Sequence, residues 1–232
     1  MHVFFLLTLF GDPFITGPLA VAVLAWFAAI GYRRAALYWA LSFAGGVGLV
    51  ALTKFVYSGW GIGIAAWRFT GISGHTMLSA SVYPLVALVC ARGKMGMRFA
   101  IVAGFAFAFS IGVSRVVLGF HSWSEILSGW MVGASAAVFT VSRMRRADER
   151  ELDEPTSAER RASQSAGLRA SWMSESTAGV TRSTAAFAAV ACIIAVLSYG
   201  RSVPVSAWIS HVAPKVAEWS RGWLDVRADA GA

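Results

Sequence analysis

The sequence predicts an all-α membrane protein in which six transmembrane helices form one bundle. Of its 232 residues, 57% are hydrophobic and only 14% are charged, which is the balance of a membrane protein rather than of a soluble domain. The apolar residues gather in runs that approach the roughly 20 residues a helix needs to cross a bilayer. Short polar links separate these runs. Composition and spacing together therefore favour a helical bundle embedded in a membrane.

The first segment, Met1–Phe10, is apolar but has neither a basic leader nor a small-residue cleavage site. We therefore interpret it as an interfacial or partly inserted segment rather than as a cleaved signal peptide. The sequence Gly11-Asp12-Pro13 interrupts the apolar run after it. The six predicted spans are then Phe14–Ile30, Ala36–Phe55, Thr76–Ala91, Phe99–Val117, Ser122–Val141 and Thr184–Tyr199.

Basic residues indicate how the bundle is oriented. They gather in the first link, in the third link and after the fifth span, namely at Arg33, Arg34, Arg92, Lys94, Arg98, Arg143, Arg145 and Arg146. Because cytoplasmic loops carry an excess of Lys and Arg, these three segments should be cytoplasmic. The second and fourth links then face the other side of the membrane. With its short loops, the chain fits a bacterial inner membrane with those two links in the periplasm.

The chain divides into a five-span core, residues 1–142, and three segments after it. Residues 143–183 are rich in Arg, Glu, Ser and Ala with little apolar periodicity, which predicts a flexible cytoplasmic linker before the sixth span at 184–200. Residues 201–232 repeat large apolar residues at helical spacing, although Pro214 breaks the pattern or starts a new helix. They predict an amphipathic tail on the outer membrane face, with its apolar side formed by Trp208, Val212, Val216, Trp219 and Trp223.

Charge and cysteine content argue against a nucleic-acid-binding protein and against a disulfide-bonded or metal-binding protein. The net charge is +8, but the basic residues lie in links and in the polar segment, so nucleic acid is not an expected partner. Cys90 and Cys192 lie in separate apolar runs, where we interpret them as small apolar fillers. No Cys/His cluster has metal-ligand spacing, so we expect neither a metal nor another cofactor. The oligomeric state stays open.

The fourth link holds the most informative stretch, Ser114-Arg115-Val-Val-Leu-Gly-Phe-His121-Ser-Trp-Ser-Glu125. If Ser122 opens the next helix, His121 and Glu125 meet on one face because they are four residues apart. A carboxylate beside an imidazole fixes its tautomer, as a nucleophilic or basic histidine requires. Arg115 adds a permanent cation whose planar fork suits phosphate oxygens.

The second link ends in Ser73-Gly74-His75-Thr76, directly before the third span. Ser73 is a candidate N-cap, and the N–H groups of a helix N-terminus favour an anion. Gly74 lets a bulky ligand approach the backbone, and His75 could give a proton to a leaving oxygen. Each group alone has a structural explanation, such as an ordinary cap or a snorkelling arginine. Two histidines, several cations and a carboxylate on one face of so apolar a protein instead favour a functional site.

These residues resemble the motifs of the type 2 phosphatidic acid phosphatase family, the membrane relatives of vanadium haloperoxidases. The family pattern Ser-Arg-x5-His-x3-Asp is matched from Ser114 to Glu125, with glutamate in place of aspartate. The pattern Pro-Ser-Gly-His is matched by Ser73-Gly74-His75, with Ile72 where proline is usual.

The family's remaining motif, Lys-x6-Arg-Pro, is matched only in part. Lys54 stands at the end of the second span, whereas Arg68 follows at a longer spacing and precedes Phe69 instead of proline. The resemblance covers about residues 36–142 and agrees with the six-span plan of the family.

The resemblance implies a role for each matched residue. His121 would attack phosphorus and form a phosphohistidine, Glu125 would orient it, and His75 would protonate the leaving oxygen and then help to activate water. The residue chemistry supports this assignment, because phosphoryl transfer needs in-line positioning and cations around the equatorial oxygens. The phosphoryl oxygens would be held by Lys54, Arg68, Ser73, Gly74 and Arg115.

The expected substrate is a membrane lipid phosphate, because the motifs lie at a membrane surface where the spans end in Phe, Trp and Tyr. Phosphatidate-type lipids, phosphatidylglycerol phosphate and a polyprenyl diphosphate such as undecaprenyl diphosphate all fit a metal-independent phosphatase of this kind. Two alternatives stay open. A phosphotransferase would pass the phosphoryl group to a lipid or sugar acceptor, and a non-catalytic protein would bind or transport a lipid phosphate and tolerate His121→Asn.

Overall fold

The computed structural model describes residues 1–29, 32–91, 93–153, 185–200 and 205–229. These residues form helices and connecting turns, with no strand among them, so the all-α prediction is confirmed for this part of the chain. One further helix, Ala185–Ser198, precedes the last one. The labelled helices are α1 (His2–Leu9), α2 (Pro13–Ala29), α3 (Arg33–Trp60), the short 3₁₀ helix η1 (Ala65–Trp67), α4 (Gly74–Cys90), α5 (Gly93–Val117), α6 (Trp123–Asp153) and α8 (Val205–Asp229).

The helices place the protein in a membrane, although not all of them have spanning length. Four stretches are long and apolar enough to cross a bilayer, and they make this an integral membrane protein: His2–Ala29, Arg33–Trp60, Gly96–Val117 and Trp123–Met144. The other two predicted spans are shorter apolar helices, α4 and Ala185–Ser198. With 17 residues, α4 is about 26 Å long, less than the roughly 30 Å of the hydrocarbon core. Where they are described, all six predicted spans are thus largely helical, but six full spans are not confirmed.

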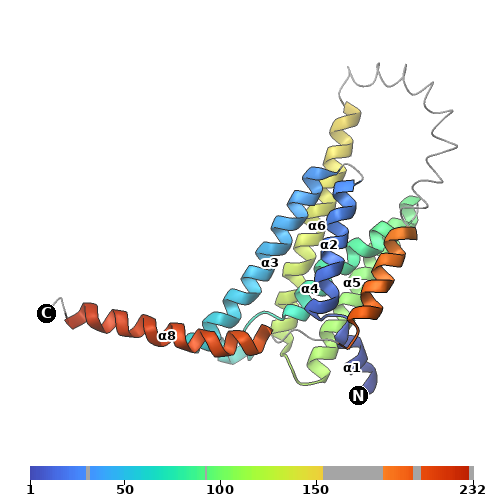
Figure 1. Ribbon diagram of the computed structural model, residues 1–232. Helices are drawn as coiled ribbons and strands as arrows, with labels where there is room; N and C mark the ends of the chain where they lie inside the picture. The colour runs from blue at the N-terminus through green and yellow to red at the C-terminus, as the bar shows by residue number, and fades with distance from the viewer. Residues whose placement is uncertain (30–31, 92, 154–184, 201–204, 230–232) are drawn as a thin grey trace, which may run out of the picture.

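The short helix α4 lies at the centre of the bundle and packs against both α5 and α6 (Figure 1). Its side chains Met77 and Leu85 are fully buried. Two glycines of α6 allow the close approach, because a Cβ on Gly133 would collide with the Met77 carbonyl oxygen and one on Gly129 would lie 2.6 Å from the Ser73 carbonyl oxygen. Small residues let helix backbones come together in this way. The contact brings the start of α4 next to the start of α6.

Replacing Gly133 by alanine is expected to destabilise the bundle, because the added methyl group would press on the backbone of α4. Overpacking of this kind costs about 1–3 kcal/mol. Gly48→Ala is the matched control, since nothing lies within 4 Å of the methyl group added there and alanine favours a helix more than glycine does. Thermal unfolding in detergent should show a lower Tm for Gly133→Ala alone. Equal Tm values for the two variants would contradict the proposed packing.

The helix of the fifth span continues further than the sequence predicted, although its apolar stretch ends at Met144. This helix, α6, runs to Asp153, so residues 143–153, the first part of the predicted linker, are helical and not irregular. These residues are mostly good helix formers and include neither glycine nor proline, so they extend a helix that packing has already started. The rest of the predicted linker, 154–183, lies outside the described residues.

The C-terminal segment forms α8, which continues through Pro214 instead of breaking there. Ala213 and Ala217 are fully buried where α8 crosses Gly59 of α3. Figure 1 shows α8 projecting sideways from the end of the bundle, at an angle to the other helices. The helix is therefore placed as a surface helix would be, and its position on the outer membrane face stays a prediction.

Candidate active site

The second and fourth links, far apart in the chain, lie against each other at one end of the bundle. The backbone N–H of Ser73 donates to the carbonyl of Glu125 at 3.0 Å. The hydroxyl of Ser124 donates to the carbonyl of Trp67 at 2.8 Å. Because α4 and α6 begin directly after these links, the close packing of the two helices also brings the links together. The motifs of the two links therefore lie next to each other at this end of the bundle.

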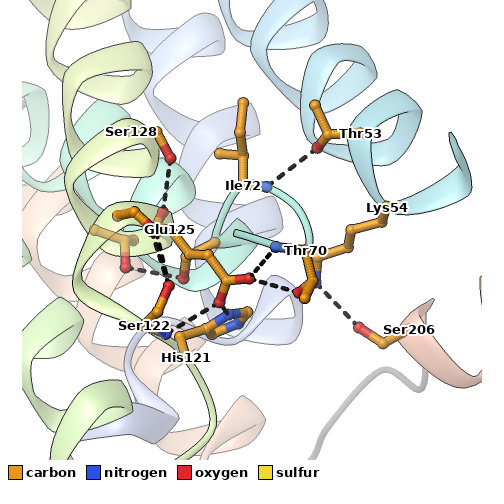
Figure 2. Close-up of polar contacts among 12 residues, drawn as sticks. Thr53, Lys54, Thr70, Ile72, His121, Ser122, Glu125, Ser128 and Ser206 are labelled. Carbon is orange, nitrogen blue, oxygen red and sulfur yellow. Dashed lines mark hydrogen bonds and ion pairs between the residues drawn. The ribbon is translucent and has the colours of Figure 1, made fainter. Parts of the chain in front are cut away.

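The Glu125 carboxylate holds the two links together (Figure 2). Its Oε2 accepts the N–H of Ser122 at 3.1 Å and lies 2.7 Å from Nδ1 of His121. Its Oε1 accepts both the N–H and the hydroxyl of Thr70, at 2.7 and 2.5 Å. The side chain is only 4% exposed. Four partners around two oxygens fit an ionised carboxylate, which can only accept hydrogen bonds.

His121 is held in one tautomer by this carboxylate. Since Glu125 only accepts, the proton of the 2.7 Å contact lies on Nδ1, and Nε2 keeps its lone pair. Burial lowers the pKa of His121, and the charges of Lys54 and Arg115 lower it further, whereas the hydrogen bond to Glu125 raises it. The net effect is a lowered pKa. A neutral imidazole with an available Nε2 is what a nucleophilic histidine requires.

Two of the predicted cations lie on different sides of the site. Arg68 lines a cleft of about 640 Å³ together with His121 and Glu125. Its φ of 49° lies in the left-handed region, which residues other than glycine seldom adopt and which often marks functional positions. Lys54 instead lines a second hollow, and its ammonium donates to the hydroxyl of Ser206 in α8 at 3.2 Å.

Arg115 has one N–H group without a hydrogen-bond partner among the described residues. Its guanidinium lies 4.4 Å from the centre of the Phe120 ring, and Nη1 donates to the hydroxyl of Thr8 in α1 at 3.3 Å. Its buried Nε has no hydrogen-bond partner among the described residues. Buried donors are almost always paired, so this N–H is suited to an anionic oxygen that binds in the site.

The second predicted motif begins α4. Ser73 is the N-cap residue, as predicted, but it is fully buried and its hydroxyl pairs with that of Thr76 at 3.0 Å instead of with a backbone N–H. Gly74 and His75 follow in the first turn of α4 and line a hollow of about 270 Å³ together with Lys54. The other walls of this hollow are largely apolar side chains of α2, α3, α4 and α8.

Three polar residues of the site were not predicted from the sequence. Neither Thr70 nor Ser206 belongs to a motif of polar residues, and only the fold brings them to Glu125 and Lys54. Asp12 did give a signal, because a carboxylate between two apolar runs is costly near a bilayer. It is 4% exposed, and its Oδ2 lies 3.9 Å from Nε2 of His75.

The bundle of apolar helices sets a histidine–carboxylate pair near guanidinium and ammonium groups, an arrangement suited to an anionic substrate in a membrane protein. The PAP2 superfamily model matches residues 54–149, which include every site residue predicted from the motifs. A relative from Klebsiella pneumoniae, an uncharacterized 22.5 kDa protein in the cps region, is 35% identical over 150 residues, or 62% of this chain and 70% of that protein. No solved structure matches the chain. The chain belongs to the PAP2 superfamily, whose members are generally phosphatases.

Proposed function

We propose that this protein is a membrane lipid phosphate phosphatase, which hydrolyses a phosphomonoester or diphosphate of a lipid through a phosphohistidine on His121. The observation that carries the proposal is the buried contact of 2.7 Å between His121 and Glu125, beside a cleft that also contains Arg68. The cations Lys54 and Arg115 act electrostatically on the same imidazole. Such an arrangement supplies a nucleophile and the charge that phosphoryl transfer needs.

The reaction takes two steps. Nε2 of His121 attacks phosphorus, and the bond from phosphorus to the leaving oxygen breaks as His75 gives that oxygen a proton. Water then attacks phosphorus, His75 takes a proton from it, the P–N bond breaks, and inorganic phosphate leaves. Arg115, Lys54 and Arg68 would stabilise the phosphoryl oxygens in both steps.

The hollows beside the site favour a lipid as the substrate. The hollow at Lys54, Gly74 and His75 is apolar on its other walls and suits a hydrocarbon tail. The cleft at His121 is bordered by exposed aromatic side chains, Trp67, Phe120 and Trp123, of the kind that gather at membrane interfaces. By the distribution of basic residues, this end of the bundle faces the periplasm. A periplasmic site would act on phosphatidate-type lipids or on a carrier-lipid diphosphate.

The proposal is tested by measuring phosphate release from phosphatidate, phosphatidylglycerol phosphate and undecaprenyl diphosphate in detergent. We expect release from at least one of them, at the same rate with and without a chelator. Within the described residues no group of three or more His, Cys, Asp or Glu side chains could hold a metal ion. Inhibition by the chelator would contradict the mechanism, lipid binding without release would contradict catalysis, and label moving to an added acceptor without free phosphate would indicate a phosphotransferase.

Activity is expected to fall at acidic pH only below the ordinary histidine value of 6.5. Attack requires neutral His121, and its pKa lies below 6.5 chiefly because the ring is buried. As pH falls through that lowered pKa, the ring gains a proton and the nucleophile is lost. A profile of kcat/KM against pH, with Tm measured at each pH to exclude unfolding, checks this. An acidic limb centred above pH 6.5 would contradict the assignment.

A further inference from the structure

The turn between α1 and α2 contributes a carboxylate to the site from outside the family match. Asp12 has 6% of its side chain exposed. Its Oδ1 accepts the N–H of Phe14 at 2.8 Å and so caps α2. Its Oδ2 points elsewhere and lies 3.9 Å from Nε2 of His75. One carboxylate therefore has two separable contacts, one with the backbone and one with the site.

The position of this carboxylate is fixed by close packing. A Cβ on Gly11 would lie 3.0 Å from the Cβ of His75 and 2.7 Å from Ile111, so the turn presses directly on the first turn of α4. The hydroxyl of Tyr83, also in α4, donates to the carbonyl of Phe10 at 2.6 Å. These contacts hold the two residues directly before Asp12. Its approach to His75 is thus built into the fold (Figure 1 shows α1 at the end of the bundle where the site lies).

The surroundings of His75 oppose its protonation. Burial lowers the pKa of His75 to about 3, with further lowering by Arg115 from α5, Lys54 from α3 and His121 from the fourth link. A residue that gives a proton to a leaving oxygen must first carry one. Asp12 is the carboxylate that the structure pairs with His75, and it also attracts Arg115. It supplies the negative charge that a protonated imidazole needs among these cations.

We propose that Asp12 is a positioning residue of the reaction, the counterion that stabilises the charge of His75 when the imidazole carries the proton for the leaving oxygen. The distance of 3.9 Å suits this role, because it is short enough for an ion pair and too long for a hydrogen bond. Asp12 therefore supports the charge without taking the proton, and Nε2–H stays available. The role rests on the proposed function, in which His75 is the proton donor.

A first experiment follows His75 directly by ¹⁵N chemical shifts, from pH 4 to 9, with and without inorganic phosphate. Asp12→Asn and Asp12→Ser both remove the charge but keep an oxygen that can cap α2. We expect both variants to keep the wild-type Tm. The protonation midpoint of His75 should fall by about one pH unit, so that its protonated fraction at the lowest pH falls about tenfold. Folded variants with an unchanged His75 would overturn the proposal. This readout needs no turnover, so it stays valid if the wild-type protein releases no phosphate and the proposed function fails.

A second experiment compares leaving groups. With a lipid phosphate, whose alkoxide must be protonated, kcat is expected to fall at least about tenfold in Asp12→Asn and Asp12→Ser. With p-nitrophenyl phosphate, whose leaving group departs without a proton, we expect little change. Asp12→Ala, which also removes the cap, should in addition lower Tm. Equal losses on both substrates would show that Asp12 only supports the fold and would overturn the proposal.

Discussion

Replacing His121 by alanine is expected to abolish phosphate release, by about 10⁴-fold or more. Loss of a covalent nucleophile leaves only the contribution of binding and of the charged pocket, and losses of this size are typical when the nucleophile of a coupled catalytic unit is removed. The variant should still fold, because Glu125 keeps the three hydrogen bonds from Thr70 and Ser122. Phosphate release and Tm, measured on the same preparation, check both statements.

His211→Ala is the matched control for this experiment. His211 is exposed on α8 and contacts Lys215, so its loss should leave activity and Tm unchanged. Rapid quenching with a labelled lipid phosphate adds a direct observation, since the wild-type protein should retain acid-labile label and His121→Ala should retain none. Full activity in folded His121→Ala protein would refute the nucleophile.

The contact between His121 and Glu125 could be predicted from the sequence because it is local. A separation of four residues at the start of a helix brings two side chains together, whatever the rest of the chain does. The second half of the Glu125 environment could not be predicted in this way. Thr70 reaches the carboxylate only because α4 packs closely on α6 at Gly129 and Gly133, and that packing is a tertiary property.

The same distinction holds for the fold. Apolar runs predicted where the helices lie, because the backbone N–H and C=O groups of each run must hydrogen-bond within the run in a membrane. They did not predict that α6 continues to Asp153, because helix propensity beyond the apolar run carries no membrane signal. Nor did they predict that Thr8 reaches Arg115, because a segment interpreted as interfacial gave no reason to place it inside the site. The costly carboxylate of Asp12 was a signal, but only the fold shows that it approaches His75.

Replacing Glu125 by glutamine is expected to lower kcat/KM by about 10³–10⁴-fold, as a misplaced tautomer does in other histidine-dependent sites. The carboxylate accepts on both oxygens, from Thr70 on one side and from Ser122 and His121 on the other. An amide has only one acceptor, so its NH₂ must face donors on one of the two sides. Facing His121, it donates to Nδ1, moves the ring proton to Nε2 and removes the nucleophilic lone pair. Facing Thr70, it leaves that N–H unpaired, which costs about 1–3 kcal/mol of stability.

Glu125→Asp is the matched control, because it keeps the charge and accepts on both oxygens. The shorter side chain still starts four residues after His121, so much of the activity should remain, while reach to Thr70 is lost and Tm falls. Kinetics and Tm of both variants separate the two contributions of Glu125. If Glu125→Gln were as active as Glu125→Asp, the carboxylate would not set the tautomer of His121, and a neutral hydrogen-bonding partner would suffice.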